Sequence, residues 1–315
     1  MAFRAGTLAA AFACLAGAAM AAEGGVGFYV LGSRTINAGM VAPPGITVQT
    51  SLYAFSGRTD ATIPEAGRLQ VGLEGEAAIG FVTGLWVPEA EIAGGRPYAL
   101  LLVPFGWKQS RVSATLELPD GPPLGGARTE DGTAFGDPVV GGGIGWGGGP
   151  WFASANLLVN VPAGPYDDGS TTNVSFHRWA ADLTGAATYV WESGWQANAA
   201  LGLSVNGENP ATDYRTGTEL HLEGALAKRL GGLTLGLAGY HYRQVTGDSG
   251  AGAVLGDFKG RVSALGPTVA WTGARGRQPV ILAGSWFHEF DAENRIPGDV
   301  LFLNVTLPLG ARPGG

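Results

Sequence analysis

The sequence is poor in charged residues and in cysteine. Asp, Glu, Lys and Arg make up 14% of the 315 residues, against about 25% in an ordinary soluble domain. The formal net charge is −7 and basic residues form no run, which argues against a nucleic-acid-binding protein. Cys14 is the only cysteine, so no disulfide within the chain can stabilise the fold.

Long hydrophobic runs are also missing after the first 22 residues. A transmembrane helix needs about 18 consecutive apolar residues. The closest approach is "PYALLLVPFGW" at 97–107, which contains two prolines. A chain that crosses a membrane without such helices must form a closed β-barrel, because only closure leaves no unpaired backbone edge in lipid.

The first 22 residues predict a secretory signal peptide. "MAFRAGTLAAAFACLAGAAMAA" has one arginine near its start, then a short apolar stretch, then the small residues of a cleavage site. Removal of residues 1–22 leaves an exported chain with no cysteine, which extensive backbone pairing or a large core must hold together. An N-terminal membrane anchor is the alternative interpretation.

What the sequence has in excess is glycine, 54 of 315 residues, and alternating polarity. In "WQANAALGLSVN", residues 195–206, the odd positions are apolar and the even positions are small or polar. This period of two predicts a long β-strand with one apolar and one polar face. The apolar face meets either a soluble core or lipid; in the second case the polar face lines a lumen.

Twelve segments of this kind follow one another, separated by turn signals such as "GGGP", "ESG" and "LGG". The approximate limits of the predicted strands are 45–57, 68–83, 97–118, 134–147, 150–162, 175–192, 194–207, 215–230, 232–246, 257–274, 277–290 and 299–309.

The strand lengths and connections favour an outer-membrane barrel over a soluble sandwich. Soluble strands have about 5–6 residues, whereas most of these segments are long enough to cross a bilayer at a tilt. Short turns alternate with longer loops such as 163–174 and 247–256, and Trp179, Tyr189 and Trp191 lie at the ends of an apolar stripe. We therefore predict an all-β fold, a transmembrane antiparallel β-barrel of about 12 strands, within a range of about 10 to 14.

A set of short stretches also carries a family resemblance. They are "EGGVGFYVLGSRTINAGMVAPPG" from residue 23, "FGDPVV" at 135–140, "VPAGPYDDG" at 161–169, "NGENPATDYRTGTEL" at 206–220, "GLAGYHYRQVTGDSG" at 236–250, "ALGPTVAW" at 264–271 and "NRIPGDVLFLNVTLPL" at 294–309. In this order they resemble the meta-pathway of phenol degradation family of outer-membrane transporters. The last strand departs from the usual barrel pattern, because it ends at Leu309 rather than at an aromatic residue.

The resemblance implies passive uptake of small hydrophobic, phenol-like aromatic compounds across the bacterial outer membrane, after export through the periplasm. The domain organisation that we expect is a signal peptide at 1–22, an N-terminal segment at 23–44 and the barrel at 45–315. The expected partners are outer-membrane lipid, the solutes and the barrel-assembly machinery. A structural or adhesive barrel without permeation, and an outer-membrane lipid-modifying enzyme, are the alternatives.

Motifs for catalysis are weak, and we expect no enzyme, no cofactor and no metal. "GDSG" at 247–250 lies between two predicted strands and suits a turn better than a serine nucleophile. "GIGWGG" formally matches a dinucleotide fingerprint, but no helix follows it. The four histidines, His177, His221, His241 and His288, lack the spacing of metal ligands.

The lumen is therefore the candidate site. The polar faces of the predicted strands carry Glu74, Glu76, Arg178, Asp182, Glu219, His221, Glu223 and Arg261. These side chains either pair across strands to hold the wall or form a constriction that sorts solutes.

Two further hypotheses concern the path of the solute. "YHYRQ" places Tyr240, Tyr242 and Gln244 on one side of a strand; either the tyrosines face the lumen and stack on phenolic rings, or they belong to an interfacial girdle. Residues 23–44 have no strand pattern and are rich in Gly and Pro; they either plug the lumen or form a disordered periplasmic tail.

Overall fold

The structure, a computed structural model, describes residues 23–63, 69–116, 122–254, 256–275 and 278–309. The predicted signal peptide, residues 1–22, lies outside the described residues. The described part is all-β apart from one 3₁₀ turn, η1 (Glu23–Gly25). Among the described residues, no helix has the length and hydrophobicity needed to cross a membrane.

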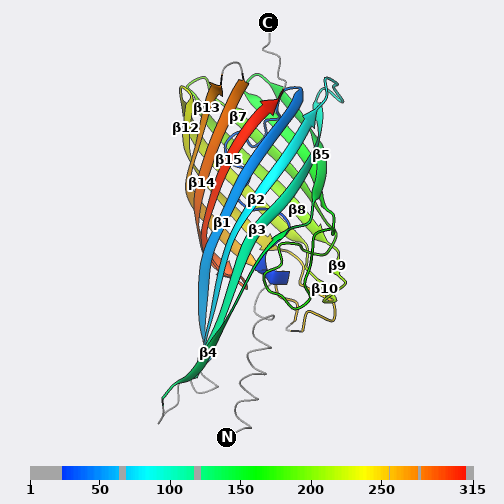
Figure 1. Cartoon of the computed structure of the whole chain (residues 1–315). Coiled ribbons are helices and arrows are strands. Elements are labelled where there is room, and N and C mark those ends of the chain that lie inside the picture. Colours follow the sequence, from blue (N-terminus) through cyan, green and yellow to red (C-terminus); the bar gives the residue numbers. More distant parts are fainter. Residues whose placement is uncertain (1–22, 64–68, 117–121, 255, 276–277, 310–315) are drawn as a thin grey trace.

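The strands form one long barrel (Figure 1). Their bounds are β1 (Gly45–Ile63), β2 (Leu69–Val87), β3 (Arg96–Leu116), β4 (Leu124–Phe135), β5 (Val139–Gly148), β6 (Trp151–Asn160), β7 (Ala180–Val190), β8 (Trp195–Asn206), β9 (Glu208–Asn209), β10 (Tyr214–Arg215), β11 (Glu219–Leu230), β12 (Leu233–Gln244), β13 (Arg261–Arg275), β14 (Gln278–Glu293) and β15 (Gly298–Leu309).

Antiparallel pairing closes the sheet through β2 and β3. β4 and β5 pair with successive parts of β3, so they are two halves of one wall strand interrupted at residues 136–138. Counted in this way the barrel has twelve antiparallel strands, as the sequence predicts. β9 and β10 form a separate small hairpin in a connecting loop.

The alternation in β8 sets which way its side chains face. Leu201 and Leu203 are exposed on the outside of the barrel, whereas Gln196 and Ser204 are buried on the inside. The same division holds on β11, where Leu222 and Leu226 are exposed and the alternate positions Glu219, His221 and Glu223 are buried. Apolar outside and polar inside is the arrangement of a barrel in lipid.

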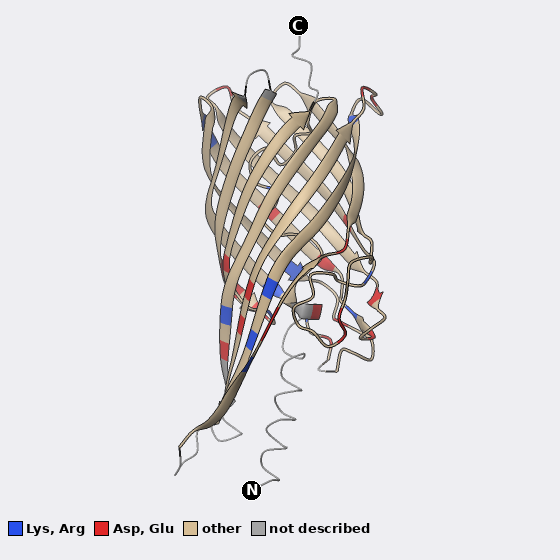
Figure 2. Ribbon diagram, viewed as in Figure 1, with Lys and Arg blue, Asp and Glu red and all other residues tan. Residues whose placement is uncertain are grey.

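The two ends of the barrel differ. At the tight-turn end, where β15 finishes and β1 begins, the connections from β5 to β6, β7 to β8 and β11 to β12 span only a few residues. At the other, long-loop end the connections are 161–179, 207–218 and 245–260. Figure 2 shows most charged residues toward the long-loop end, with a largely uncharged wall above it.

A tapered extension continues past the barrel at the long-loop end (Figure 1). β1 pairs with β15 only as far as Gly57, but it pairs with β2 as far as Ile63. β4 belongs to this extension, and the predicted strands include only its last two residues, 134 and 135. Its sequence, "LGGARTEDGTAF", has no apolar stripe because most of its side chains are exposed to water.

Candidate functional site: the barrel lumen

One side of the lumen, formed by β6, β7, β8 and β11, is lined by buried polar side chains. Buried polar groups need partners, and here they serve one another: Thr188 donates to Asn198 at 2.7 Å, and Asn206 donates to Glu219 at 2.9 Å. We call this side the polar wall. Its inward residues are Asn156, Asp182, Thr184, Thr188, Gln196, Asn198, Ser204, Asn206, Glu219, His221 and Glu223.

Asp182 is the centre of the polar wall. Its carboxylate accepts hydrogen bonds from Thr184 Oγ1 at 2.5 Å and Ser204 Oγ at 2.6 Å, and lies 2.8 Å from His221 Nε2. An aspartate, a histidine and a serine thus meet here, but the serine hydroxyl bonds to the carboxylate and not to the imidazole. The imidazole is therefore not the hydrogen-bond partner of the serine hydroxyl, which differs from the order of a Ser–His–Asp triad.

The opposite side of the lumen, formed by β12 to β15 and β1, carries a cluster of aromatic and aliphatic side chains beside the buried polar residues Ser51, Thr268, Ser285 and Glu289. The rings of Tyr240 and Phe287 meet edge to face with centroids 5.2 Å apart, as do those of Tyr53 and Phe302. Such pairs stabilise a wall beyond simple burial. We call this side the aromatic wall. Its residues are Tyr53, Phe55, Tyr240, Tyr242, Val262, Phe287, Val300 and Phe302.

The two tyrosines of "YHYRQ" lie inward in the aromatic wall, each 4% exposed. Protein carboxylates bind their hydroxyls: Tyr240 donates to Glu289 at 2.8 Å, and Tyr242 donates to Glu219 at 2.7 Å. Gln244 continues the same side of β12 and donates to Asp248. The guanidinium carbon of Arg295 lies 5.2 Å from the centroid of the Tyr242 ring, so in this structure both hydroxyls and part of the ring surface are already in contact with the protein.

Among the other predicted site residues, five lie inside the barrel. Asp182, Glu219, His221 and Glu223 belong to the polar wall, and Arg178, 1% exposed, lies just before β7 at its long-loop end. The structure thus brings together the acidic, basic and histidine positions of β7 and β11.

The predictions for Glu74, Glu76 and Arg261 are wrong. Glu74 and Glu76 share the parity of the exposed Val82 and project from the outer face of β2, Glu76 at the end of the β1–β15 pairing and Glu74 beyond it. Arg261 is 40% exposed at the rim and pairs with Asp291 and Glu293. The stripe of apolar residues opposite Glu74 faces inward, because this side of the lumen is itself apolar.

The N-terminal segment, residues 23–44, runs between the two walls. Four backbone amides donate to side chains of the polar wall: Arg34 to Glu223 at 2.7 Å, and Asn37, Ala38 and Gly39 to Gln196, Asn198 and Thr188 at 3.4, 3.2 and 3.0 Å. The side chain of Arg34 also reaches Asn156, at 2.8 Å. These bonds satisfy backbone donors that a strandless segment would otherwise leave unpaired.

On its other side the N-terminal segment meets the aromatic wall. Val30 and Leu31 pack against that cluster. Gly32 follows with φ at 84°, and a Cβ on it would lie 2.8 Å from the ring of Phe287. Only glycine combines this conformation with this approach, so the aromatic wall requires the glycine at this position.

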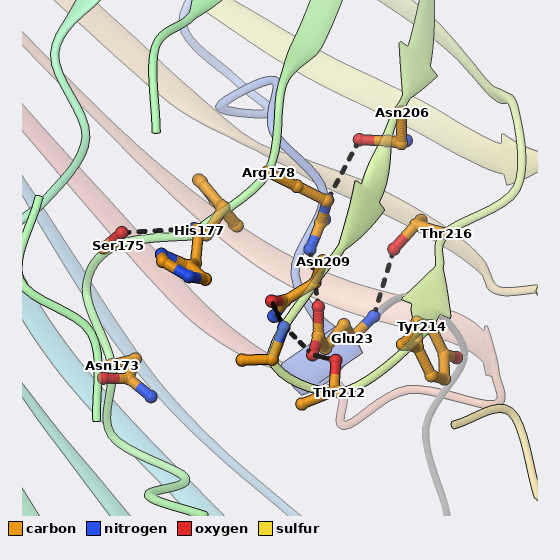
Figure 3. Close-up of polar contacts among 12 residues, drawn as sticks. Glu23, Asn173, Ser175, His177, Arg178, Asn206, Asn209, Thr212, Tyr214 and Thr216 are labelled. Atoms are coloured by element: carbon orange, nitrogen blue, oxygen red, sulfur yellow. Dashed lines mark hydrogen bonds and ion pairs between the residues drawn. The ribbon is translucent and has the colours of Figure 1, made fainter. Parts of the chain in front are cut away.

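The long-loop end holds the beginning of the segment (Figure 3). Glu23 forms an ion pair with Arg178 at 3.2 Å and accepts hydrogen bonds from Asn209 and Thr212. Because Val41 approaches Gly145 toward the other end of the barrel, residues 23–44 extend through the lumen from the long-loop end toward the tight-turn end.

Sequence reasoning did not single out Arg34, Glu23 or the amides that hold the segment. The only available signal was the run of Asn, Gln, Thr and Ser on the polar faces of β7 and β8, which are side chains suited to bonding a backbone. As for metals, the described residues contain no group of three or more His, Cys, Asp or Glu placed to hold one.

Comparisons with known proteins agree with this architecture. A family model described as "Putative MetA-pathway of phenol degradation" matches residues 58–305. No curated protein matches the sequence.

Among solved structures, the crystal structure of the COG4313 outer membrane channel from Pseudomonas putida F1 matches with a TM-score of 0.67 and 15% identity, over 87% of this chain and 98% of that one. A Pseudomonas aeruginosa FadL homologue matches with a TM-score of 0.38 and 10% identity, over 84% and 90%. The β domain of the Bordetella autotransporter Brka matches with 0.43 and 12%, over 84% and 100%. The first likeness shows the fold, that of an outer-membrane channel; the other two are too distant to argue from.

Proposed function

Because the chain belongs to the family described as the putative MetA-pathway of phenol degradation, we propose that it is a passive outer-membrane channel for small hydrophobic, phenol-like aromatic compounds. Its fold is that of an outer-membrane β-barrel channel. The proposal involves no catalytic step, cofactor or metal. Its partners are outer-membrane lipid around the barrel, the assembly machinery that inserts it, and the solutes.

The aromatic wall is the observation that carries the proposal. A channel for sugars or ions needs polar groups on all sides of its path, since such solutes keep hydrogen bonds throughout their passage. Here the inward residues of β12 to β15 and β1 include one cluster of aromatic and aliphatic side chains, beside buried polar residues such as Thr268 and Ser285. Ring contacts worth about 0.5–1.5 kcal/mol each hold an aromatic solute weakly enough to release it.

We further propose that residues 23–44 plug the lumen at rest. The segment donates hydrogen bonds to one wall and covers the other with Val30 and Leu31. A solute that enters must replace those two aliphatic side chains on the aromatic wall. Burial of a ring of similar size can offset their loss, because hydrophobic burial depends on area and not on direction.

Deletion of residues 23–44 from the exported chain tests the plug. We expect the single-channel conductance in planar bilayers to rise severalfold while the barrel still folds, as its unchanged heat-dependent gel mobility would show. Uptake of labelled phenol at low concentration is measured in parallel in cells, because a plain lipid vesicle is itself permeable to phenol. Unchanged conductance would contradict the plug. Unchanged phenol uptake on removal of the whole protein would favour a structural barrel without permeation.

A further inference from the structure

At the long-loop end the carboxylate of Glu23 lies among side chains from two loops (Figure 3). Three side chains contact the Glu23 carboxylate: Arg178 Nη1 at 3.2 Å, Asn209 Nδ2 at 2.8 Å and Thr212 Oγ1 at 2.5 Å. They come from the two loops at 161–179 and 207–218, and these contacts are therefore built into the loop structure rather than into the N-terminal segment.

The side chain of Arg178 is fixed by neighbouring residues, but one of its terminal nitrogens has no hydrogen-bond partner among the described residues. Arg178 is 1% exposed. Its guanidinium carbon lies 5.1 Å from the centroid of the Phe176 ring, and its Nε donates to Asn206 Oδ1 at 3.4 Å. Its Nη2 is buried, and no described residue hydrogen-bonds to it. A guanidinium binds a carboxylate best through two parallel hydrogen bonds, so Glu23, which engages Nη1 alone, is an imperfect ligand for this site.

The surroundings suit a carboxylate that carries an aromatic ring. Tyr166 stacks on His177 with ring centroids 4.7 Å apart, and its hydroxyl accepts from Asn209 at 3.0 Å. Burial and the nearby Glu23 carboxylate raise the pKa of Tyr166, so its ring stays neutral. Together with Phe176 under the guanidinium, these rings give the three polar side chains apolar flanks.

We propose that Arg178, Asn209 and Thr212 form a binding site for the carboxylate of a small aromatic acid, and that Glu23 is its built-in competitor. An acid arriving from the long-loop end binds the guanidinium through both nitrogens and displaces Glu23, which frees the outer end of the N-terminal segment. This inference rests on the proposed function, because it makes an acidic relative of the solute the signal that loosens the plug.

Benzoate binding to the purified full-length barrel tests the site directly. Titration calorimetry in detergent compares the exported wild-type chain with Glu23→Gln, which keeps the size of the side chain but removes its charge. A tethered competitor acts at millimolar effective concentration, so we expect Glu23→Gln to lower the Kd for benzoate by about tenfold or more. Benzyl alcohol, which has the ring without the carboxylate, should show no such difference.

Arginine variants show where the benzoate binds. In the Glu23→Gln background, Arg178→Gln should abolish benzoate binding, and Arg215→Gln should change the Kd less than about twofold, because Arg215 is exposed in the same loop and lacks the fork toward Glu23. If Arg178→Gln fails to fold, Arg178→Lys keeps the charge and removes the fork, and should weaken benzoate about tenfold.

An equal benzoate Kd for the wild type and Glu23→Gln, or binding that survives both changes at Arg178, would overturn the inference. Failure of the proposed function has a different signature, which is normal benzoate binding and competition with no effect of benzoate or of Glu23→Gln on conductance or phenol uptake. Conversely, phenol uptake without any benzoate site would leave the channel proposal standing and remove only the receptor.

Discussion

The two walls of the lumen hold the same N-terminal segment in different ways. The polar wall binds its backbone through directional hydrogen bonds, for example from Ala38 to Asn198 and from Arg34 to Glu223. The aromatic wall only packs against its side chains, Val30 and Leu31. Directional bonds fix the register of a segment, whereas apolar contact fixes only the area covered.

This difference divides two tasks within one lumen. In the proposed channel, the polar wall holds the segment in place because a small solute cannot supply acceptors to all four of its bonded backbone amides at once. In the same proposal, the aromatic wall exchanges the segment for a solute because either one buries the same rings. A channel that is closed by its own chain needs both properties, one for the closed state and one for its opening.

Substitution in the aromatic wall should have the largest effect on stability. Phe287 is fully buried, and Phe287→Ala should lower the free energy of unfolding by about 3–5 kcal/mol through lost burial and a residual cavity. Phe290→Ala on the same strand is the control, since Phe290 is 49% exposed on the outer face and should cost much less. Urea unfolding in detergent measures both; equal costs would mean that the lumen side of β14 is not packed.

On the outer face of the barrel, we expect the same substitution to cost the same stability on strands of either wall. Leu201 lies on a polar-wall strand and Leu303 on an aromatic-wall strand, and both are exposed on the outside. Arginine at either position should cost about 2–4 kcal/mol in unfolding from bilayers, with alanine at each as the control for lost contact. A cost at Leu201 alone, or at Leu303 alone, would show that the two halves do not lie equally in lipid.

Loss of one acceptor in the polar wall should loosen the segment. Asn198→Ala removes the partner of the Ala38 amide and of Thr188, and should cost about 1–3 kcal/mol in stability because buried donors lose their acceptor. Single-channel conductance should also rise. Ser204→Ala is the matched control: Ser204 is buried in the same wall but bonds to Asp182 and not to the segment, so it should destabilise without changing conductance.

The sequence predicted the facing of a strand correctly only where its apolar side chains lie on the outside of the barrel. On β8 the apolar stripe is exposed on the outside and the polar stripe is buried inside, as the alternation predicted for a barrel in lipid. On β2 the same logic assigned Glu74 and Glu76 to the lumen, and failed, because here the apolar positions face inward and the charged positions face outward near the long-loop end. Periodicity reports that two faces differ in polarity, and not which of them is inside.

The site was less accessible to prediction than the fold, because half of it is not a strand. The segment containing Arg34 and Gly32 has no period, and its contacts are made by backbone amides that every sequence possesses. Arg178 was predicted, but its partner Glu23 lies 155 residues away along the chain. Such pairs depend on a threading of the lumen that local sequence patterns do not describe.

The smallest expected effect concerns the tyrosines of the aromatic wall. Replacement of both Tyr240 and Tyr242 by Leu keeps an apolar lumen but removes the ring faces, worth about 0.5–1.5 kcal/mol to an aromatic solute, or about 2- to 12-fold in Kd. Uptake of labelled phenol should therefore fall at low concentration, where binding limits flux, and recover at high concentration.

Replacement of both tyrosines by Phe separates the rings from the hydroxyls. It removes the hydrogen bonds to Glu289 and Glu219 and should lower stability, yet leave phenol uptake at low concentration close to that of the wild type. If the Phe variant lost uptake as the Leu variant did, the hydroxyls and their carboxylates would be the recognition elements. The lumen would then use its polar wall for solutes as well as for its own N-terminal segment, and the division of tasks between the walls would fail.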